Sequence, residues 1–407
     1  MQAMPAVDTS LLERSLPHKA RAFAGPPGAA HALVLLAEIA GGACAFAPVP
    51  MDRPLALYGA GSLGRLAREF LTSVGHDFAL VIDRNAEALA RDPTWAGIEI
   101  RHPDAVSPAA KRAHRFAVSI VTSPYAPIEQ SLRENGFDDV VPFYDLAESF
   151  RALHPLSNGW LAPALTAGDL DSAAGVLAHW HDDMSRAHHL QFLAWRRLRE
   201  EWTFAGAPVV TDNRFFIPEV TGILYDDEVF VDAGAHHGSV TGAFIRQTGG
   251  AFGAIAAIEP DLANRAILED NLGAWLPRDA RVTTCGCALA EANGSAPFCD
   301  GLGYASQLSL LGATRITTRA LDGLALAPSF LKLHLEGGEL AALKGARETL
   351  RAHRPIVAAT VYHNADGIWR TPLWLMENLE NYRFLFRGHG WCGTGAVVYA
   401  IPGERHA

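Results

Sequence analysis

The sequence predicts an α/β protein with two doubly wound Rossmann-like domains joined by a helical connector. Two stretches share one order of features, in which an apolar strand is followed by a glycine turn, a helix, a second strand and an acidic residue. The first stretch begins at residue 55 and the second at residue 228, and each has the pattern of a βαβ unit. Between them, residues 171–202 contain no proline and place apolar side chains at helical spacing, which predicts the connector.

Length and composition limit the classes of protein to consider. The 407 residues fit roughly two to three domains. Hydrophobic residues make up 49% and charged residues 19%, which excludes a disordered, coiled-coil or fibrous protein. The net charge of −10 repels polyphosphate, so general nucleic-acid binding is not expected.

The N-terminal segment, residues 1–50, is predicted to be a helical extension. An amphipathic helix is expected over residues 29–40, ended by Gly41 and packed on the first domain. His31 and Glu38 make the same stretch a poor membrane span, so no integral membrane segment is expected. Five cysteines without a CxxC pair argue against a disulfide framework and indicate a reducing, cytoplasmic location.

The first predicted domain, residues 51–150, contains the turn GAGSLG. Gly59, Gly61 and Gly64 form GxGxxG between a strand and a helix, and Asp83 closes the next strand. This spacing can bring backbone amides and a helix N-terminus to a phosphate. Two interpretations are open, a bound nucleotide or nucleotide-sugar and a purely structural Rossmann-like domain.

The connector is predicted over residues 151–210 and the second domain over residues 211–407. In the run VFVDAGAHHG, the residues Asp232, Gly234 and Gly238 form DxGxxxG, which differs from the dinucleotide spacing. Glu259 ends the following strand, where a carboxylate can accept hydrogen bonds from both ribose hydroxyls. The pattern favours an S-adenosylmethionine site, with another nucleotide or a plain tight turn as alternatives.

From residue 215 onward, across nearly two hundred residues, the chain resembles the FkbM family of S-adenosylmethionine-dependent methyltransferases. The resemblance is carried by seven motifs in one order: FFIP (215–218), DDEVFVDAGAHHG (226–238), AIEPD (257–261), CALAEANG (287–294), TTRALD (317–322), KLHLEGGELAALKGA (332–346) and VYHNADGIWRTP (361–372). It implies a class I methyltransferase fold, with seven mostly parallel strands and an antiparallel final strand.

The resemblance also implies where the cofactor, S-adenosylmethionine, would bind. Gly234 and the backbone around it, including Ala235 and His236, would cradle the methionine part. Glu259 would hold the ribose. The adenine would lie between two residues, Ala288 and Leu289.

Three histidines depart from the family pattern. His334 stands where the family usually carries Asp, and His236 and His237 stand where it offers Asn or Asp. His334, beside Glu336, and His363 end neighbouring predicted strands, so they are expected at one sheet edge. One of the two imidazoles is a candidate general base.

Two alternatives to a base stay open. His334 can be a hydrogen-bonded structural residue in place of a carboxylate. A metal site is the second alternative, although no metal is expected; its candidate ligands are His236, His237, His334, Glu336, His363 and His389.

The predicted function is an S-adenosylmethionine-dependent O-methyltransferase. Its acceptor would be a hydroxyl of a sugar, glycolipid or polyketide-like metabolite, with Asp366 and Trp369 as a candidate wall of the substrate site. The alternative is a nucleotide-sugar-binding or sensing protein whose methyltransferase-like domain is silent. A nicotinamide-dependent oxidoreductase is disfavoured because no dehydrogenase domain is recognisable. The sequence does not fix the oligomeric state and is compatible with a homo-oligomer.

Overall fold

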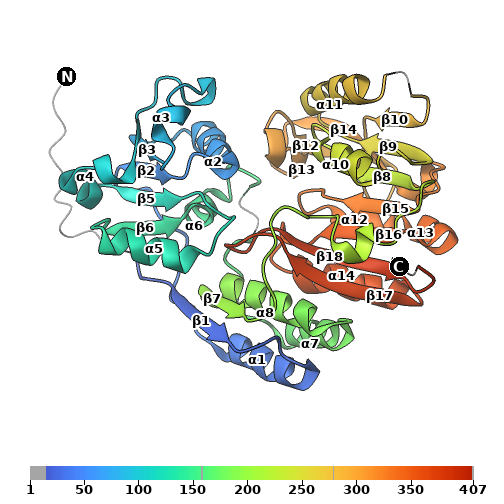
Figure 1. Ribbon diagram of the computed structural model, residues 1–407, viewed down its shortest axis with the longest axis horizontal. Helices are drawn as coiled ribbons and strands as arrows, with labels where there is room; N and C mark the ends of the chain where they lie inside the picture. The colour runs from blue at the N-terminus through green and yellow to red at the C-terminus, as the bar shows by residue number, and fades with distance from the viewer. Residues whose placement is uncertain (1–14, 157–158, 278, 406–407) are drawn as a thin grey trace.

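A computed structural model describes residues 15–156, 159–277 and 279–405. The first 14 residues of the predicted N-terminal extension lie outside the described residues. Figure 1 shows two sheet-containing regions side by side, the first in blue to teal and the second in yellow to red. The α/β class and the two parallel-sheet regions are as predicted.

The first region contains a five-stranded, fully parallel sheet in the order β4-β3-β2-β5-β6. Its strands are β2 (Leu55–Tyr58), β3 (Leu80–Ile82), β4 (Ile100–Arg101), β5 (Arg115–Val118) and β6 (Asp139–Pro142). Its α-helices are α2 (Ser62–Ser73), α3 (Ala86–Leu89), α4 (Pro108–Ala113), α5 (Tyr125–Glu134) and α6 (Phe143–Ala147). The strand order reverses between β2 and β5, so the glycine turn after β2 lies at the switch point.

The connector consists of α7 (Ala167–His179), α8 (Asp183–Leu198) and a strand, β7 (Glu200–Phe204). The expectation of helix up to residue 202 is wrong at this strand. Arg199 takes a left-handed conformation at φ 58° and ends α8, and the chain then pairs in parallel with β1 (Lys19–Phe23). Aromatic packing stabilises the pair, since the Phe23 and Phe204 rings stack 4.4 Å apart.

The N-terminal helix α1 (Ala29–Gly41) has nearly the predicted bounds but a different neighbour. It packs on α7 and α8, so the prediction that it packs on the first domain is wrong. The reason is the pairing of β1 with β7, which brings the following helix to the connector. The side chain of Leu198 fills the space beside Gly42, and Arg197 donates to the Gly42 carbonyl.

The second region contains the expected seven-stranded sheet, in the order β10-β9-β8-β15-β16-β18-β17. Its strands are β8 (Val229–Ala233), β9 (Ala254–Ile258), β10 (Val282–Cys285), β15 (Phe330–Leu333), β16 (Ile356–Thr360), β17 (Tyr382–Gly388) and β18 (Ala396–Pro402). All run parallel except β18, which is antiparallel to both neighbours. Its α-helices are α9 (Pro218–Thr221), α10 (Ser239–Gln247), α11 (Leu262–Trp275), α12 (Glu339–Lys344), α13 (Arg347–His353) and α14 (Gly367–Asn378).

A small four-stranded sheet, absent from the prediction, lies beside the large one. Its strands are β11 (Ala288–Leu289), β14 (Thr314–Arg319), β12 (Gly294–Cys299) and β13 (Gln307–Leu308) in that order. In the large sheet, Leu333 pairs with both Ala233 and Ala359. The loops after β8, β15 and β16 therefore meet at one edge. No helix in the described ranges is both long and apolar enough to cross a membrane.

Candidate active site

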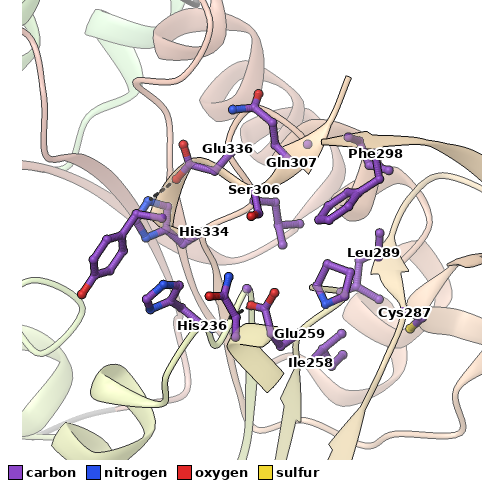
Figure 2. A pocket seen from close by; sticks show the side chains of 18 of the residues that line it. His236, Ile258, Glu259, Cys287, Leu289, Phe298, Ser306, Gln307, His334 and Glu336 are labelled. Carbon is purple, nitrogen blue, oxygen red and sulfur yellow. Dashed lines mark hydrogen bonds and ion pairs between the residues drawn. The ribbon is translucent and has the colours of Figure 1, made fainter. Parts of the chain in front are cut away.

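A narrow cavity of about 70 Å³ opens at this edge, between the glycine turn after β8 and the small sheet. Figure 2 shows His334 and Glu336 on one side of it and Cys287, Leu289 and Phe298 on the other. Six predicted site residues on four separate chain segments line it together with His236: Gly234, Glu259, Ala288, Leu289, His334 and Glu336.

Glu259, at the end of β9, presents a fixed carboxylate to this cavity (Figure 2). One oxygen accepts the amide of His236 at 2.8 Å and the other accepts the amide of Asp261 at 2.9 Å. The residue is 5% exposed, and burial raises its pKa. Each oxygen keeps a second lone pair, so the carboxylate can accept two further hydrogen bonds from a ligand.

The rest of the cavity is mainly an apolar slot. Ala288 and Leu289 are buried because β11 pairs with β14, and they face Ile258, Phe298 and Leu308 around the same space. Such a slot suits a flat aromatic ring, with polar groups of Asn264, Ser306 and Gln307 at its border.

The glycines of the second turn are required by packing. Gly234 has φ 75°, and a Cβ there would lie 1.9 Å from the carbonyl oxygen of His334. Gly238 has φ 84°, and a Cβ there would lie 2.8 Å from the Leu268 side chain. Gly238 does not line the cavity, so this glycine serves the packing of α10 on α11.

Asp232 also lies away from the cavity lining. Its carboxylate is fully buried, 2.7 Å from the Lys332 ammonium, and accepts the Thr241 hydroxyl at 2.6 Å. Lys332 in turn donates to the Gly234 carbonyl at 2.8 Å. This buried pair braces the turn from below and leaves Asp232 without access to a ligand.

The loops after β15 and β16 bring His334, Glu336 and His363 together as one cluster. His334 Nε2 lies 3.1 Å from His363 Nε2 and 3.2 Å from a Glu336 oxygen. His363 Nδ1 lies 3.0 Å from the other Glu336 oxygen. The Tyr362 hydroxyl is also 3.2 Å from His334 Nε2. The shared sheet edge predicted for the two histidines is therefore present.

Burial sets the charges in this cluster. It lowers the pKa of His334 to about 3 and raises the pKa of Tyr362 to about 12. Burial alone would raise the pKa of Glu336, but the electrostatic interaction with His363 and hydrogen bonds from both imidazoles hold it below its ordinary range. At neutral pH the cluster therefore contains a neutral His334, a neutral Tyr362 and a carboxylate.

A second cavity of about 420 Å³ continues from the first and lies between the two domains. The two share Gly234, His236, Tyr304, His334 and Glu336. His363, Ala235 and Lys332 line only the second. Its other walls include residues that were not among the predicted site residues: Ser62, Leu63 and Leu66 of α2, with Tyr144, Trp160, Arg214, Phe215 and Tyr362.

The predicted substrate wall is not part of either cavity. Asp366 pairs with Arg370 at 2.9 Å, and Trp369 is 4% exposed within α14. The segment forms the start of α14, which packs on α7. Neither residue lines these two cavities, and a role of Asp366 and Trp369 in the substrate site stays a prediction.

The remaining histidines do not join the cluster. His237 lies 3.2 Å from the Asn264 side chain, and His389 contacts the Val210 carbonyl and the Tyr399 hydroxyl. His236 stacks on Tyr304 at 3.9 Å and lines both cavities. Neither of its ring nitrogens has a hydrogen-bond partner within the part of the chain that the structure describes.

The first glycine turn borders a separate cavity of about 380 Å³, which Gly59 and Asp83 line and Gly61 and Gly64 do not. The Asp83 carboxylate accepts the amides of Ala60 and Asn85, both at 2.8 Å. A Cβ on Gly64 would lie 2.3 Å from the Gly59 carbonyl oxygen, so this glycine permits close packing of helix and strand. A nucleotide in this turn stays a prediction.

Comparison with known proteins finds a family model that matches part of the second region. Residues 232–386 match the model of the methyltransferase FkbM domain. The crystal structure of a methyltransferase FkbM from Methylobacillus flagellatus is similar over 92% of this chain and 100% of that one, with a TM-score of 0.62 and 19% identity.

A second solved structure is that of precorrin-6y C5,15-methyltransferase from Geobacter metallireducens. The match covers 48% of this chain and 98% of that chain. Its TM-score is 0.29 at 15% identity. No curated protein matches the chain.

Proposed function

We propose that the protein is an S-adenosylmethionine-dependent O-methyltransferase, because residues 232–386 match the model of the methyltransferase FkbM domain. Its acceptor is a hydroxyl of a sugar, glycolipid or polyketide-like metabolite. One observation carries the proposal: the cavity with the Glu259 carboxylate is continuous with the cavity at the His334, Glu336 and His363 cluster.

The lining of the narrow cavity fits this cofactor. The free lone pairs of Glu259 suit the two ribose hydroxyls, and the slot beside Ala288 and Leu289 suits an adenine ring. The turn at Gly234 and His236 connects the slot to the second cavity. When bound, S-adenosylmethionine supplies a methyl group on a sulfonium, which an oxygen nucleophile can attack.

The cluster supports an alcohol as the nucleophile, because an alcohol must lose its proton during attack. His334 is neutral and Glu336 is ionised, so both have lone pairs for a hydroxyl proton. Both side chains are largely shielded from solvent, which strengthens these interactions.

The second cavity supports a cyclic, hydroxyl-bearing acceptor. Tyr144, Trp160, Phe215 and Tyr362 contribute aromatic faces, which suit the apolar face of a sugar or polyketide ring. Arg196 holds this wall, since its guanidinium lies 4.3 Å from the Trp160 ring and donates to the carbonyls of Gly159 and Tyr362.

The test is transfer of labelled methyl from S-adenosylmethionine to a panel of monosaccharides, glycolipids and polyketides, with the product located by mass spectrometry. We expect an O-methyl product, and we expect His334→Ala to lower kcat by about 10²–10⁴-fold with cofactor affinity near wild type. Glu269→Gln, an exposed change on α11, is the control. Methylation at carbon or nitrogen, or an unchanged kcat in His334→Ala, would contradict the proposal.

A further inference from the structure

We propose that His334, Glu336 and His363 form a binding site for one divalent transition-metal ion. Within the described residues, these three offer ligand atoms that all lie within 4.8 Å of one another. The role given to the ion below, holding an acceptor hydroxyl, depends on the proposed O-methyltransferase function. Binding of the ion itself does not.

Two separations between the ligand atoms match those of a coordination shell. Bonds of about 2.0–2.2 Å to a tetrahedral or octahedral ion place neighbouring ligand atoms about 2.9–3.6 Å apart. His334 Nε2 lies at such a separation from His363 Nε2, at 3.1 Å, and from a Glu336 oxygen, at 3.2 Å. With one ligand atom taken from each residue, all three atoms lie within 4.8 Å of one another, so a small adjustment of the side chains would close the shell around one ion.

Hydrogen bonding alone does not account for this arrangement. His334 Nε2 has an imidazole nitrogen, a carboxylate oxygen and the Tyr362 hydroxyl at 3.1–3.2 Å. An imidazole nitrogen has only one in-plane hydrogen or lone pair, so it makes one strong hydrogen bond. A cation between these groups would use the lone pairs of both histidines and the carboxylate at once.

The ligand types select the class of metal. Two imidazoles and one carboxylate are the ligands of catalytic zinc and of non-haem iron(II), whereas Mg²⁺ and Ca²⁺ prefer oxygen ligands. Three protein ligands leave coordination positions open, which is typical of a catalytic site. All three residues line the 420 Å³ cavity, so an acceptor hydroxyl there can reach the open positions.

The backbone of the two loops is held in place around the cluster. Glu336 adopts a left-handed conformation at φ 51°, which a non-glycine residue rarely takes. The Glu339 carboxylate accepts hydrogen bonds from the amides of Leu335 and Gly337, which flank Glu336, at 2.8 and 3.1 Å. Asn364, next to His363, donates to the Gly337 carbonyl at 2.9 Å and ties the two ligand-bearing loops together. Such support outside the ligands is what a metal site needs to keep its geometry.

The experiment is calorimetric titration of the chelator-treated, full-length protein with ZnCl₂, and separately with MgCl₂. We expect one Zn²⁺ per chain and no saturable Mg²⁺ binding. Glu336→Gln and His363→Gln should each weaken Zn²⁺ binding on the order of 100-fold or more. His102→Gln is the matched control, because His102 forms an exposed pair with Asp104 at 3.4 Å and reports binding to surface histidines.

Cobalt(II) gives a second readout that does not depend on activity. The wild type loaded with Co²⁺ should absorb in the visible range, and both ligand variants should lose this band while retaining wild-type circular dichroism. Unchanged Zn²⁺ affinity in both variants, or no Zn²⁺ binding by the wild type, would overturn the metal site.

The two proposals fail in distinguishable ways. If methyl transfer is undiminished after chelation and the protein binds no Zn²⁺, the metal site is contradicted and the O-methyltransferase proposal still holds. If the cluster binds Zn²⁺ but the protein does not bind S-adenosylmethionine, the proposed function is contradicted and the metal site still holds.

Discussion

The two glycine turns have the same hydrogen-bonding plan and different surroundings. In the first, the amides of Ala60 and Asn85 donate to the two oxygens of Asp83. In the second, the amides of His236 and Asp261 donate to the two oxygens of Glu259. Each acid thus fixes the turn that precedes it. This plan alone does not distinguish a ligand site from a structural turn.

The two turns differ in the residues that follow the neighbouring strands. Beside the first turn, Ser119 follows β5, and its buried hydroxyl donates to the Gly59 carbonyl at 2.6 Å. Beside the second turn, the loops after β15 and β16 supply His334, Glu336 and His363. A glycine turn positions a helix and an acid, whereas reactive groups come from the adjacent strands.

The largest expected effect comes from the buried pair under the second turn. Lys332→Met leaves the Asp232 charge buried without its partner, which should lower the free energy of unfolding by about 3–5 kcal/mol. Urea denaturation measures this. Lys344→Met is the control, because its ammonium is exposed and 4.0 Å from Glu291. Equal losses in both variants would mean that the pair does not brace the turn.

A smaller effect separates the glycines of the two turns. Gly234→Ala should cost about 3 kcal/mol, since it adds strain at φ 75° and a clash with the His334 carbonyl. Gly61→Ala should change stability by less than about 0.5 kcal/mol, because a Cβ there meets no atom within 4 Å. Thermal unfolding of both variants checks the contrast, and a similar loss at both positions would contradict it.

The smallest expected effect per residue is a loss of folding stability at acidic pH. Burial lowers the pKa of His188 to about 4 and of His189 and His389 to about 3, below the usual value near 6.5. Below pH 6.5 these histidines are protonated in the unfolded chain but stay neutral in the folded one. Their contribution to the free energy of unfolding is therefore fully present above pH 6.5 and is lost as the pH falls. Each should remove on the order of 1–2 kcal/mol between pH 7 and pH 5.

Urea denaturation across this pH range measures the effect. His389→Gln, which keeps hydrogen-bonding capacity, should show a shallower dependence on pH. A slope identical to that of the wild type would show that His389 does not contribute.

The parts of the site that follow from local sequence were predictable. Alternation of strands and helices predicts both parallel sheets, and parallel strands place His334 and His363 at one edge. The pocket at Glu259, Ala288 and Leu289 was indicated by the family motifs.

Other features depend on contacts between distant segments. The pairing of β1 with β7 joins residues about 180 positions apart, and its strands have no distinctive pattern. The second cavity forms only where α2 of the first domain faces the second. Asp366 and Trp369 do not line either cavity, because a motif gives the order of residues and not where the helix that carries them packs.

The most direct test of the account is calorimetric titration with S-adenosylmethionine of the wild type, Glu259→Gln and Asp83→Asn. The account predicts one binding site per chain, an affinity roughly 10–100-fold weaker in Glu259→Gln, since a charged hydrogen-bond acceptor is lost, and an unchanged affinity in Asp83→Asn. Loss of binding in Asp83→Asn with full affinity in Glu259→Gln would place the cofactor in the first domain and contradict the central claim.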